Sequence, residues 1–388
     1  MTTDSTYGAF DFGLSEEQEE RAARLHRESC IVDLTFQGPG SPDVWTAELE
    51  AELDAALSER GGDFMFAYWF LLEKALAGEY PEYRELYELS GATAGITEAS
   101  KLGDREQLLQ DALRARRMFD RFPWARRAFR AADVRAAKAD GEVALWGMCQ
   151  FNYLQPGQLD QVNAAHELGL MDTCELAYNQ MTFIGCGCTE RYDAGLSHFG
   201  QQFVRRCNEV GVIVDTSHSG RQTTLDACQA SSAPVVATHT SAAALYRCDR
   251  AKSDEELCAV AATGGVIGIV CVPFFLAAPG SPGQTIELVL DHVDYVSQLV
   301  GVEHVGIGTD WPIALPHALQ RRMFVPFLAE IGFREEHGVD VVAALDGFRD
   351  YRDLVNITRG LVGRGYSDGE IAGILGENFL RVFEQVVG

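Results

Sequence analysis

Two histidines follow two apolar, β-rich segments near the middle of the chain. Val212–Thr216 leads through Ser217 to His218, and Val235–Thr238 leads directly to His239. Segments of this kind, with their histidines 21 residues apart, are typical of neighbouring parallel strands in an α/β barrel, whose C-terminal ends carry the catalytic groups. Imidazole is the commonest protein ligand for metals, so the pair predicts a metal site. The alternative is that each histidine only caps its strand and bonds to backbone.

These two segments belong to a repeated pattern of strand and helix that must position the histidines. Eight short β-rich segments alternate with helical ones, which predicts a (β/α)8 TIM barrel. We place the strands at Cys30–Asp33, Thr93–Ile96, Val143–Met148, Glu175–Tyr178, Val212–Thr216, Val235–Thr238, Val266–Val272 and His304–Gly308. Amphipathic helices are expected at Ala132–Lys138, Leu196–Val210, Asp254–Ala262 and Ser367–Leu375.

The length suits one barrel, so we expect a single amidohydrolase-like domain over residues 1–388. Two stretches are longer than a barrel connection requires, at residues 38–91 and 105–140. We interpret both as helical insertions that cover the barrel mouth or form an oligomer contact.

A carboxylate is expected on the same face as the histidines. The last strand ends at Gly308 and is followed by Thr309 and Asp310, which makes Asp310 a candidate for water orientation or proton transfer. The other polar or reactive residues at strand ends are Asp33, Thr35, Gln37, Glu98, Cys149, Gln150, Tyr178 and Asn179. We expect Asp215 to point into the barrel and support its neighbours. Asp33 is a candidate for a substitute metal ligand or a hydrogen-bond anchor.

Composition restricts the partners of the protein. The net charge of −25, from 57 acidic and 32 basic residues, argues against binding to nucleic acid or to anionic membrane surfaces. We find no signal peptide and no apolar stretch of about 18 residues that would span a membrane. Ten cysteines in such a chain indicate reduced thiols rather than disulfides. We therefore expect a cytoplasmic protein that acts on a small molecule.

Motifs from residue 130 onward resemble, in order, those of the renal or membrane dipeptidase family of metal-dependent amidohydrolases. They are Val214–His218, Val236–Ser241, Arg250 ahead of Ser253-Asp254-Glu255, Gly301–Asp310 and Gly376–Val382. The resemblance implies a (β/α)8 barrel, a homodimer and hydrolysis of dipeptides, often with a D-residue or a modified residue on the C-terminal side. It also implies that His218 and His239 bind metal, that Arg250 binds the substrate carboxylate and that Asp310 is the catalytic acid/base.

The chain departs from this family at four of the expected residues. Thr35 and Gln37 stand where the first strand of the family carries a His-x-Asp pair. Gln150 stands in place of the carboxylate that bridges two metals, and Tyr178 in place of a histidine that polarises the substrate carbonyl.

These replacements change the expected metal content. Two adjacent Zn²⁺ ions need bridging negative charge to offset their repulsion, and a neutral glutamine cannot supply it. We therefore expect at most one divalent metal, with zinc as the candidate, or no metal. Water, Gln150, Asp310 or a nearby thiolate could complete its ligands.

Several replacements carry chemistry of their own. The Tyr178 hydroxyl could polarise a carbonyl, and we assign Asn179, Gln150 and Arg191 to substrate binding together with Arg250. Arg191 belongs to the loop Gly185–Gly195, which also contains Cys186, Cys188, Glu190 and Asp193. The Tyr-Asn strand end and this loop resemble a bacterial subgroup of the dipeptidases. The loop charges could equally form a structural salt-bridge cluster.

Three functions follow from these residues. The first is hydrolysis of a small amide or dipeptide-like substrate that bears a free carboxylate, at a site with at most one metal. The second is non-hydrolytic acid/base catalysis, as in an isomerase, lyase or cyclase of a specialised pathway. The third is a catalytically inactive dipeptidase homologue that only binds, since one barrel fold hosts many activities.

Overall fold

Eight parallel strands form a closed barrel at the centre of the computed structural model, which describes residues 7–388 except 37–44, 61–63, 99–100, 279 and 311–314. The strands are β1 (Val32–Asp33), β2 (Ala94–Glu98), β5 (Val143–Cys149), β7 (Thr173–Glu175), β8 (Ile213–Asp215), β9 (Val235–Ala242), β11 (Ile267–Ile269) and β12 (Val305–Ile307). They pair in this order, and β12 pairs with β1, which closes the barrel. The predicted (β/α)8 barrel is confirmed.

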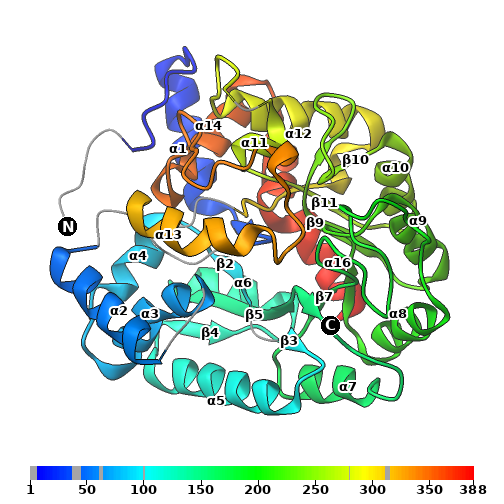
Figure 1. The fold of residues 1–388 in the computed structure, drawn as a ribbon. Helices are drawn as coiled ribbons and strands as arrows, with labels where there is room; N and C mark the ends of the chain where they lie inside the picture. The colour runs from blue at the N-terminus through cyan, green and yellow to red at the C-terminus, as the bar shows by residue number, and fades with distance from the viewer. Residues whose placement is uncertain (1–6, 37–44, 61–63, 99–100, 279, 311–314) are drawn as a thin grey trace.

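Helices surround the strands on the outside of the barrel (Figure 1). In the first half of the chain they are α1 (Glu16–Glu28), α2 (Ala47–Arg60), α3 (Phe64–Ala77), α4 (Tyr83–Ser90), α5 (Arg105–Arg121), α6 (Ala131–Asp140) and α7 (Asp160–Glu167). In the second half they are α8 (His198–Val210), α9 (Arg221–Ala230), α10 (Asp254–Ala262), α11 (Pro273–Leu276), α12 (Glu287–Val300), α13 (His317–Leu328), α14 (Val355–Gly363), α15 (Asp368–Ala372) and α16 (Asn378–Val386).

The four predicted helices are present, and one of them has the predicted bounds. α10 spans the predicted Asp254–Ala262, and the side chains of Ser253 and Glu256 form a capping box at its start. α15 begins after the cap residue Ser367, and the chain continues beyond Ala372 as a π-helical segment, Gly373–Glu377. No helix among the described residues is long and apolar enough to cross a membrane.

The position of the fourth barrel strand was predicted wrongly. The expected Glu175–Tyr178 shares only Glu175 with β7, because the hydrogen-bonded register places Thr173 and Cys174 opposite Met148 and Cys149 of β5. Tyr178 and Asn179 therefore lie in the loop after β7. Asn179 has a φ of 58°, a left-handed conformation that a regular strand does not contain.

Four short strands lie outside the barrel path and were not predicted. They are β3 (Lys101–Leu102), β4 (Ala125–Arg127), β6 (Phe151–Asn152) and β10 (Ala251–Lys252). β3 pairs with β6, β4 with β5 and β10 with β9. The stretch 105–140, expected to be helical, thus contains α5, the strand β4 and α6, whereas α2, α3 and α4 lie within 38–91.

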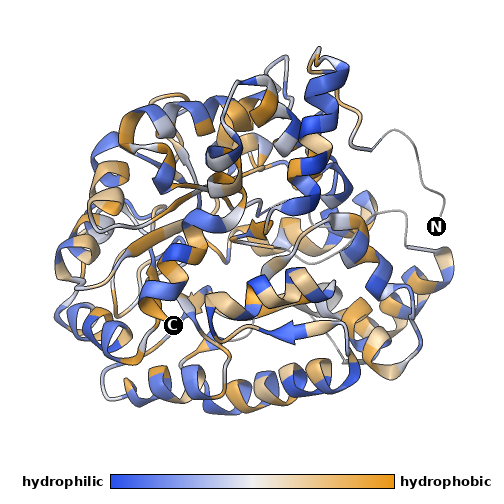
Figure 2. Ribbon diagram, turned by 180° about the vertical axis from the view of Figure 1, so that it is seen from behind, coloured by the Kyte–Doolittle hydropathy of each residue, from blue (hydrophilic) through white to orange (hydrophobic). Residues whose placement is uncertain are grey.

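Aromatic packing fills one end of the barrel. Trp146 of β5 is fully buried and stacks on Phe379 of α16 with ring centroids 5.5 Å apart, and Phe383 of the same helix lies against it. Figure 2 shows hydrophobic residues along the strands and hydrophilic residues on the outer faces of the helices. This arrangement leaves the other end of the barrel, where the strands finish, for polar residues.

A glycine allows the last strands to approach closely. A Cβ atom on Gly308 would lie 1.8 Å from the carbonyl oxygen of Thr238, a distance that no side chain tolerates. Glycine at this position therefore brings the end of β12 against the middle of β9. His239 and Asp310 become neighbours as a result.

Candidate active site

Glu175 at the end of β7, His218 in the turn after β8 and His239 in the middle of β9 converge in one place. The Nε2 atoms of His218 and His239 lie 2.9 Å apart, and Oε1 of Glu175 lies 3.8 Å from Nε2 of His239. One ligand atom from each residue falls within 4.8 Å of the others. All three side chains are buried, with exposed fractions of 0 to 2%. The structure thus brings together the two histidines that the sequence predicted.

The orientation of His218 is fixed by Asn179. Nδ1 of His218 lies 2.7 Å from Oδ1 of Asn179. The amide of Asn179 donates through Nδ2 to the carbonyl of Ile331, so its oxygen must face the imidazole. Nδ1 of His218 therefore carries the proton, and its Nε2 presents a lone pair.

The orientation of His239 is fixed by a chain of hydroxyl and carboxylate groups. Nδ1 of His239 lies 2.8 Å from Oγ1 of Thr238, whose hydroxyl donates to Asp215. Because that hydroxyl proton is already used, Thr238 accepts a hydrogen bond from Nδ1. Asp215 also accepts from the backbone and the side chain of Ser217, which confirms its expected supporting role. Nε2 of His239 is again left with a lone pair.

These hydrogen bonds make the cluster suitable for a cation. Two nitrogen lone pairs face one another with no proton between them, and Oε2 of Glu175 has no hydrogen-bond partner among the described residues. Burial lowers the pKa of both histidines, so both imidazoles are neutral. Neutral imidazoles and a carboxylate are the donors that zinc prefers, so these residues fit a divalent metal.

Asp310 lies beside the cluster on the more open side. Its Oδ2 atom is 4.0 Å from Nε2 of His239, and its side chain is 16% exposed. The backbone at Asp310 has a φ of 53°, and its N–H donates to the carbonyl of Thr35 on the neighbouring first strand. The carboxylate is therefore near the ligand atoms and also within reach of solvent.

Tyr178 covers one face of His218. The two rings are nearly parallel, with centroids 3.8 Å apart. On its other face Tyr178 stacks on Phe151, at 4.4 Å, and the ammonium group of Lys101 lies over the Phe151 ring. The ring of Tyr178 is therefore held between two others, next to a candidate metal ligand.

A comparison with models of known protein families gives one match. Residues 92–337 match the model of the membrane dipeptidases, peptidase family M19. The chain belongs to this family. Its members are hydrolases, in agreement with the chemistry of the cluster, and the family resemblance of the sequence motifs is confirmed.

Individual relatives agree with membership of the M19 family. The chain is 30% identical over 192 residues to the dipeptidase tcpJ of Claviceps purpurea, a match that covers 50% of this chain and 39% of the relative. The match thus spans less than half of that relative. Among solved structures, an amidohydrolase from Pseudomonas aeruginosa has a TM-score of 0.72 at 25% identity, over 94% of this chain and 98% of the other. A metallopeptidase from Rhodobacter sphaeroides shares the fold, with a TM-score of 0.59 at 20% identity, over 77% and 88%.

Arg250, which the M19 resemblance assigns to the substrate carboxylate, is 2% exposed. Its guanidinium donates to the backbone carbonyls of Ser217 and His239 and lies over the ring of Phe275. The Nε atom has no hydrogen-bond partner among the described residues. Arg250 thus supports the segments that carry both histidines and keeps one donor unused.

The two carboxylates of the loop Gly185–Gly195 accept hydrogen bonds from residues on either side of the loop. Glu190 accepts from the backbone N–H of Met181, and Asp193 accepts from backbone N–H groups at the start of α9, including that of Gln222. Arg191 is exposed and stands apart, over the ring of Tyr192. Glu190 and Asp193 thus have structural roles, through hydrogen bonds with backbone N–H groups rather than through the expected salt-bridge cluster.

On the first strand, Asp33 makes hydrogen bonds within the barrel. Asp33 accepts hydrogen bonds from the backbone N–H and the hydroxyl of Thr309. Of the two roles considered for Asp33, it is therefore a hydrogen-bond anchor rather than a substitute metal ligand. Burial raises the pKa of Asp33 to about 6. Gln37 and the side chain of Glu98 lie outside the described residues.

Glu175 is the site residue that the sequence analysis missed. It was placed at the start of a strand, whereas it ends β7 and faces the histidines. A signal was available, because Glu175 is the single charged residue within the apolar segment Cys174–Ala177. A carboxylate in such a segment is buried, and a buried carboxylate needs a partner.

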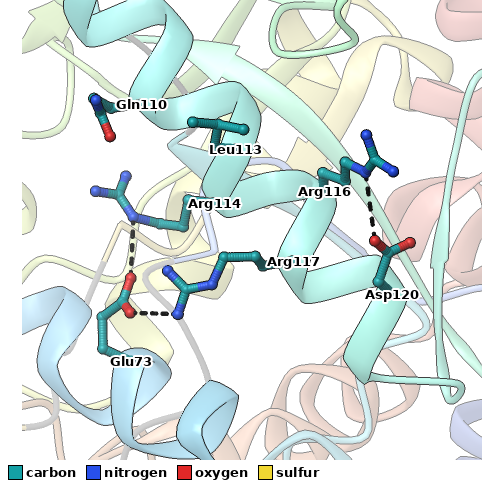
Figure 3. A pocket seen from close by; sticks show the side chains of 7 residues that line it. All are labelled: Glu73, Gln110, Leu113, Arg114, Arg116, Arg117 and Asp120. Atoms are coloured by element: carbon teal, nitrogen blue, oxygen red, sulfur yellow. Dashed lines mark hydrogen bonds and ion pairs between the residues drawn. The ribbon is translucent and has the colours of Figure 1, made fainter.

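A separate hollow of about 460 Å³ lies on the outside of the molecule, between α3 and α5. Figure 3 shows that Arg114 and Arg117 of α5 both reach Glu73 of α3, while Arg116 pairs with Asp120. These arginines already have acidic partners. The hollow therefore lies between two outer helices of the M19 protein and is separate from the strand-end site.

Proposed function

We propose that the protein hydrolyses the amide bond of a small, dipeptide-like substrate that bears a free carboxylate, with one zinc ion in its active site. The observation that carries this proposal is the convergence of His218 and His239, whose Nε2 atoms lie 2.9 Å apart, with Asp310 at 4.0 Å. Two neutral imidazoles beside a partly exposed carboxylate are the groups that metal-assisted amide hydrolysis requires.

Each residue has a distinct role in this reaction. The metal, when bound, supplies a Lewis acid that activates water and the amide carbonyl. Asp310 accepts the proton that the attacking water loses and delivers it to the leaving amine nitrogen, which completes the cleavage. The hydroxyl of Tyr178 donates a hydrogen bond to the carbonyl oxygen as negative charge develops there.

The substrate carboxylate is assigned to Arg250. Its Nε has no hydrogen-bond partner among the described residues, and a buried unpaired donor is costly unless a ligand uses it. Asn179, Gln150 and Arg191 are proposed to contact the rest of the substrate. The exposed position of Arg191 restricts it to a part of the substrate that extends toward solvent.

Two contacts support a single metal. Thr35 stands where the family resemblance places a histidine ligand, and its Oγ1 lies 2.8 Å from Nδ1 of His239, the side away from the proposed metal. Gln150 is neutral and donates to Glu175. A second divalent ion would therefore lack both a ligand on the first strand and a bridging charge on the third.

The proposal is tested by metal content and peptidase activity of protein purified without chelator. We expect about one equivalent of zinc and hydrolysis of L-Ala-D-Ala, both lost in His218→Ala. His198→Ala is the matched control, because His198 is exposed on α8 and its loss leaves both properties unchanged. Two equivalents of metal would contradict the single-metal site. Turnover without metal would favour the non-hydrolytic acid/base reaction, and the absence of both would favour a binding protein.

A further inference from the structure

Gln150 and Glu175 are direct neighbours at the ends of adjacent strands. Cys149, the last residue of β5, pairs with Cys174 of β7, so the residues that follow them lie side by side. Nε2 of Gln150 donates to Oε1 of Glu175 over 3.3 Å. The position where the family resemblance expects an anionic ligand is therefore neutral, while the adjacent position carries a carboxylate.

We propose that Glu175 is the anionic ligand of the metal, so that the carboxylate has moved from the end of the third barrel strand to the end of the fourth. This inference rests on the proposed function, because it concerns the same metal. It goes beyond that function by assigning a ligand that the motif comparison does not contain and by giving Gln150 the role of orienting it.

The burial of Glu175 requires such a partner. Its side chain is 0% exposed, and Oε2 has no hydrogen-bond partner among the described residues. A buried carboxylate oxygen without a partner is strongly unfavourable unless a cation or a donor compensates it. Burial raises the pKa of Glu175, and the negative charges of Asp215 and Asp310 raise it further. A divalent cation at the histidine Nε2 atoms would compensate these negative charges.

An ordinary ion pair with His239 does not explain the contact. Oε1 of Glu175 lies 3.8 Å from Nε2 of His239, but the proton of that imidazole is on Nδ1, bonded to Thr238. Burial keeps the imidazole neutral. When Glu175 is ionised, the oxygen and the nitrogen meet as two acceptors, an arrangement that a shared cation stabilises.

The resulting donor set is that of a catalytic zinc site. Two histidines and one carboxylate leave a fourth position open for water or substrate. Asp310 lies on the more exposed side of this set. The carboxylate on the fourth strand thus provides the third protein ligand. The bridging position that a second metal needs stays neutral.

The test compares zinc affinity of the metal-free wild type and Glu175→Gln, measured by competition with a chromophoric chelator. Glu175→Gln keeps the shape of the side chain and removes its charge. We expect zinc to bind about 100-fold more weakly or worse. Asp33→Asn is the matched control, because Asp33 is an equally buried carboxylate whose two oxygens bond to Thr309. Its zinc affinity is expected to change by less than about threefold.

A double variant separates the charge from the position. Gln150→Glu combined with Glu175→Gln returns the carboxylate to the third strand. We expect this double variant to bind zinc at least about tenfold more tightly than Glu175→Gln alone. Glu175→Asp keeps the charge but shortens the side chain, so that the visible spectrum of the cobalt-substituted protein changes. Circular dichroism of each metal-free variant verifies that the barrel is folded.

The outcomes distinguish this inference from the proposed function. Equal zinc affinity of folded wild type and Glu175→Gln would overturn the assignment of Glu175 and leave the metal on the histidines intact. If Glu175→Gln does not fold, an unchanged cobalt spectrum in Glu175→Asp overturns the assignment instead. Failure of the wild type itself to bind zinc or cobalt would overturn both.

Discussion

Oγ1 of Thr35 lies 2.8 Å from Nδ1 of His239, so that the first barrel strand supports this imidazole from behind. Thr238 contacts the same nitrogen at 2.8 Å. A position that the family resemblance assigns to a metal ligand therefore supports the imidazole that we propose as another ligand. This contact links the loss of one ligand to the orientation of the one that remains.

The two threonines are expected to contribute unequally to metal binding. Thr238→Val removes the acceptor of the Nδ1 proton and its link to Asp215, so we expect zinc affinity to fall by roughly 10- to 100-fold. Thr35→Val leaves that acceptor in place and should cost less than about tenfold. Chelator competition measures both. A larger loss in Thr35→Val than in Thr238→Val would contradict the assigned direction of the hydrogen bond.

Tyr178 combines a hydroxyl with a stacked ring, and two variants separate these contributions. Tyr178→Phe keeps the stack on His218 and Phe151, so we expect unchanged zinc content and a loss of kcat of about 100-fold. Tyr178→Leu also removes the stack and should weaken zinc binding. Steady-state kinetics and metal analysis on the same preparations provide the comparison. Full activity of Tyr178→Phe would exclude the hydroxyl from catalysis.

Asp310 is proposed to transfer protons, which predicts a specific kinetic defect. Asp310→Asn preserves the size of the side chain and tolerates the left-handed backbone, so zinc content and thermal stability should stay close to wild type. We expect kcat to fall by about 100- to 10,000-fold, because amide cannot accept the proton. If the variant instead loses its metal and keeps the activity of its zinc-loaded fraction, Asp310 is a ligand rather than a base.

Stability is predicted to depend on pH through His292 of α12, which is 1% exposed. The N–H of Ala242 donates to Nδ1 of His292, and burial lowers the pKa of the imidazole from 6.5 to about 4. The pKa of His292 is lower in the folded than in the unfolded protein. Its contribution to the free energy of unfolding is therefore present above pH 6.5 and is lost as the pH falls. Between about pH 7 and about pH 5 the loss is roughly 2 kcal/mol.

The variant His292→Asn tests this dependence. The amide oxygen can replace Nδ1 as acceptor, but it does not titrate. Urea unfolding of wild type and variant at both pH values should show a free energy of unfolding that falls less in the variant, by roughly 2 kcal/mol. Identical pH dependence in the two proteins would show that His292 is not the titrating group.

The barrel could be predicted from the sequence because most of its strands are bounded by helices with clear patterns. Asp254–Ala262 is an example in which the cap residue Ser253 fixes the start of a helix, whereas the predicted strand Val235–Thr238 continues as β9 to Ala242. The fourth strand could not be placed, since Cys174–Ala177 is buried throughout and no alternation of side chains sets its register. The strands β3 and β4 were missed because Lys101, Arg126 and Arg127 interrupt any apolar segment there.

The candidate site was predictable only in part for the same reason. His218 follows β8, Asp310 follows β12 and His239 lies within β9, and the structure brings the three together. Glu175 depends on the register of β7 against β5, which hydrogen bonding rather than composition decides. The support of His218 by Asn179 requires a turn that the sequence pattern does not define.

The left-handed backbone at Asn179 and Asp310 restricts how these positions can evolve. They are the two non-glycine residues with positive φ in the described part of the chain, and one orients a metal ligand while the other is the proposed base. A substitution by alanine or a larger residue at either position costs about 1–2 kcal/mol in backbone strain, in addition to the effect of losing the original side chain. An alanine substitution would therefore overstate how much each side chain contributes to function. Neutral substitutions at each position are expected to be mainly asparagine, aspartate and glycine.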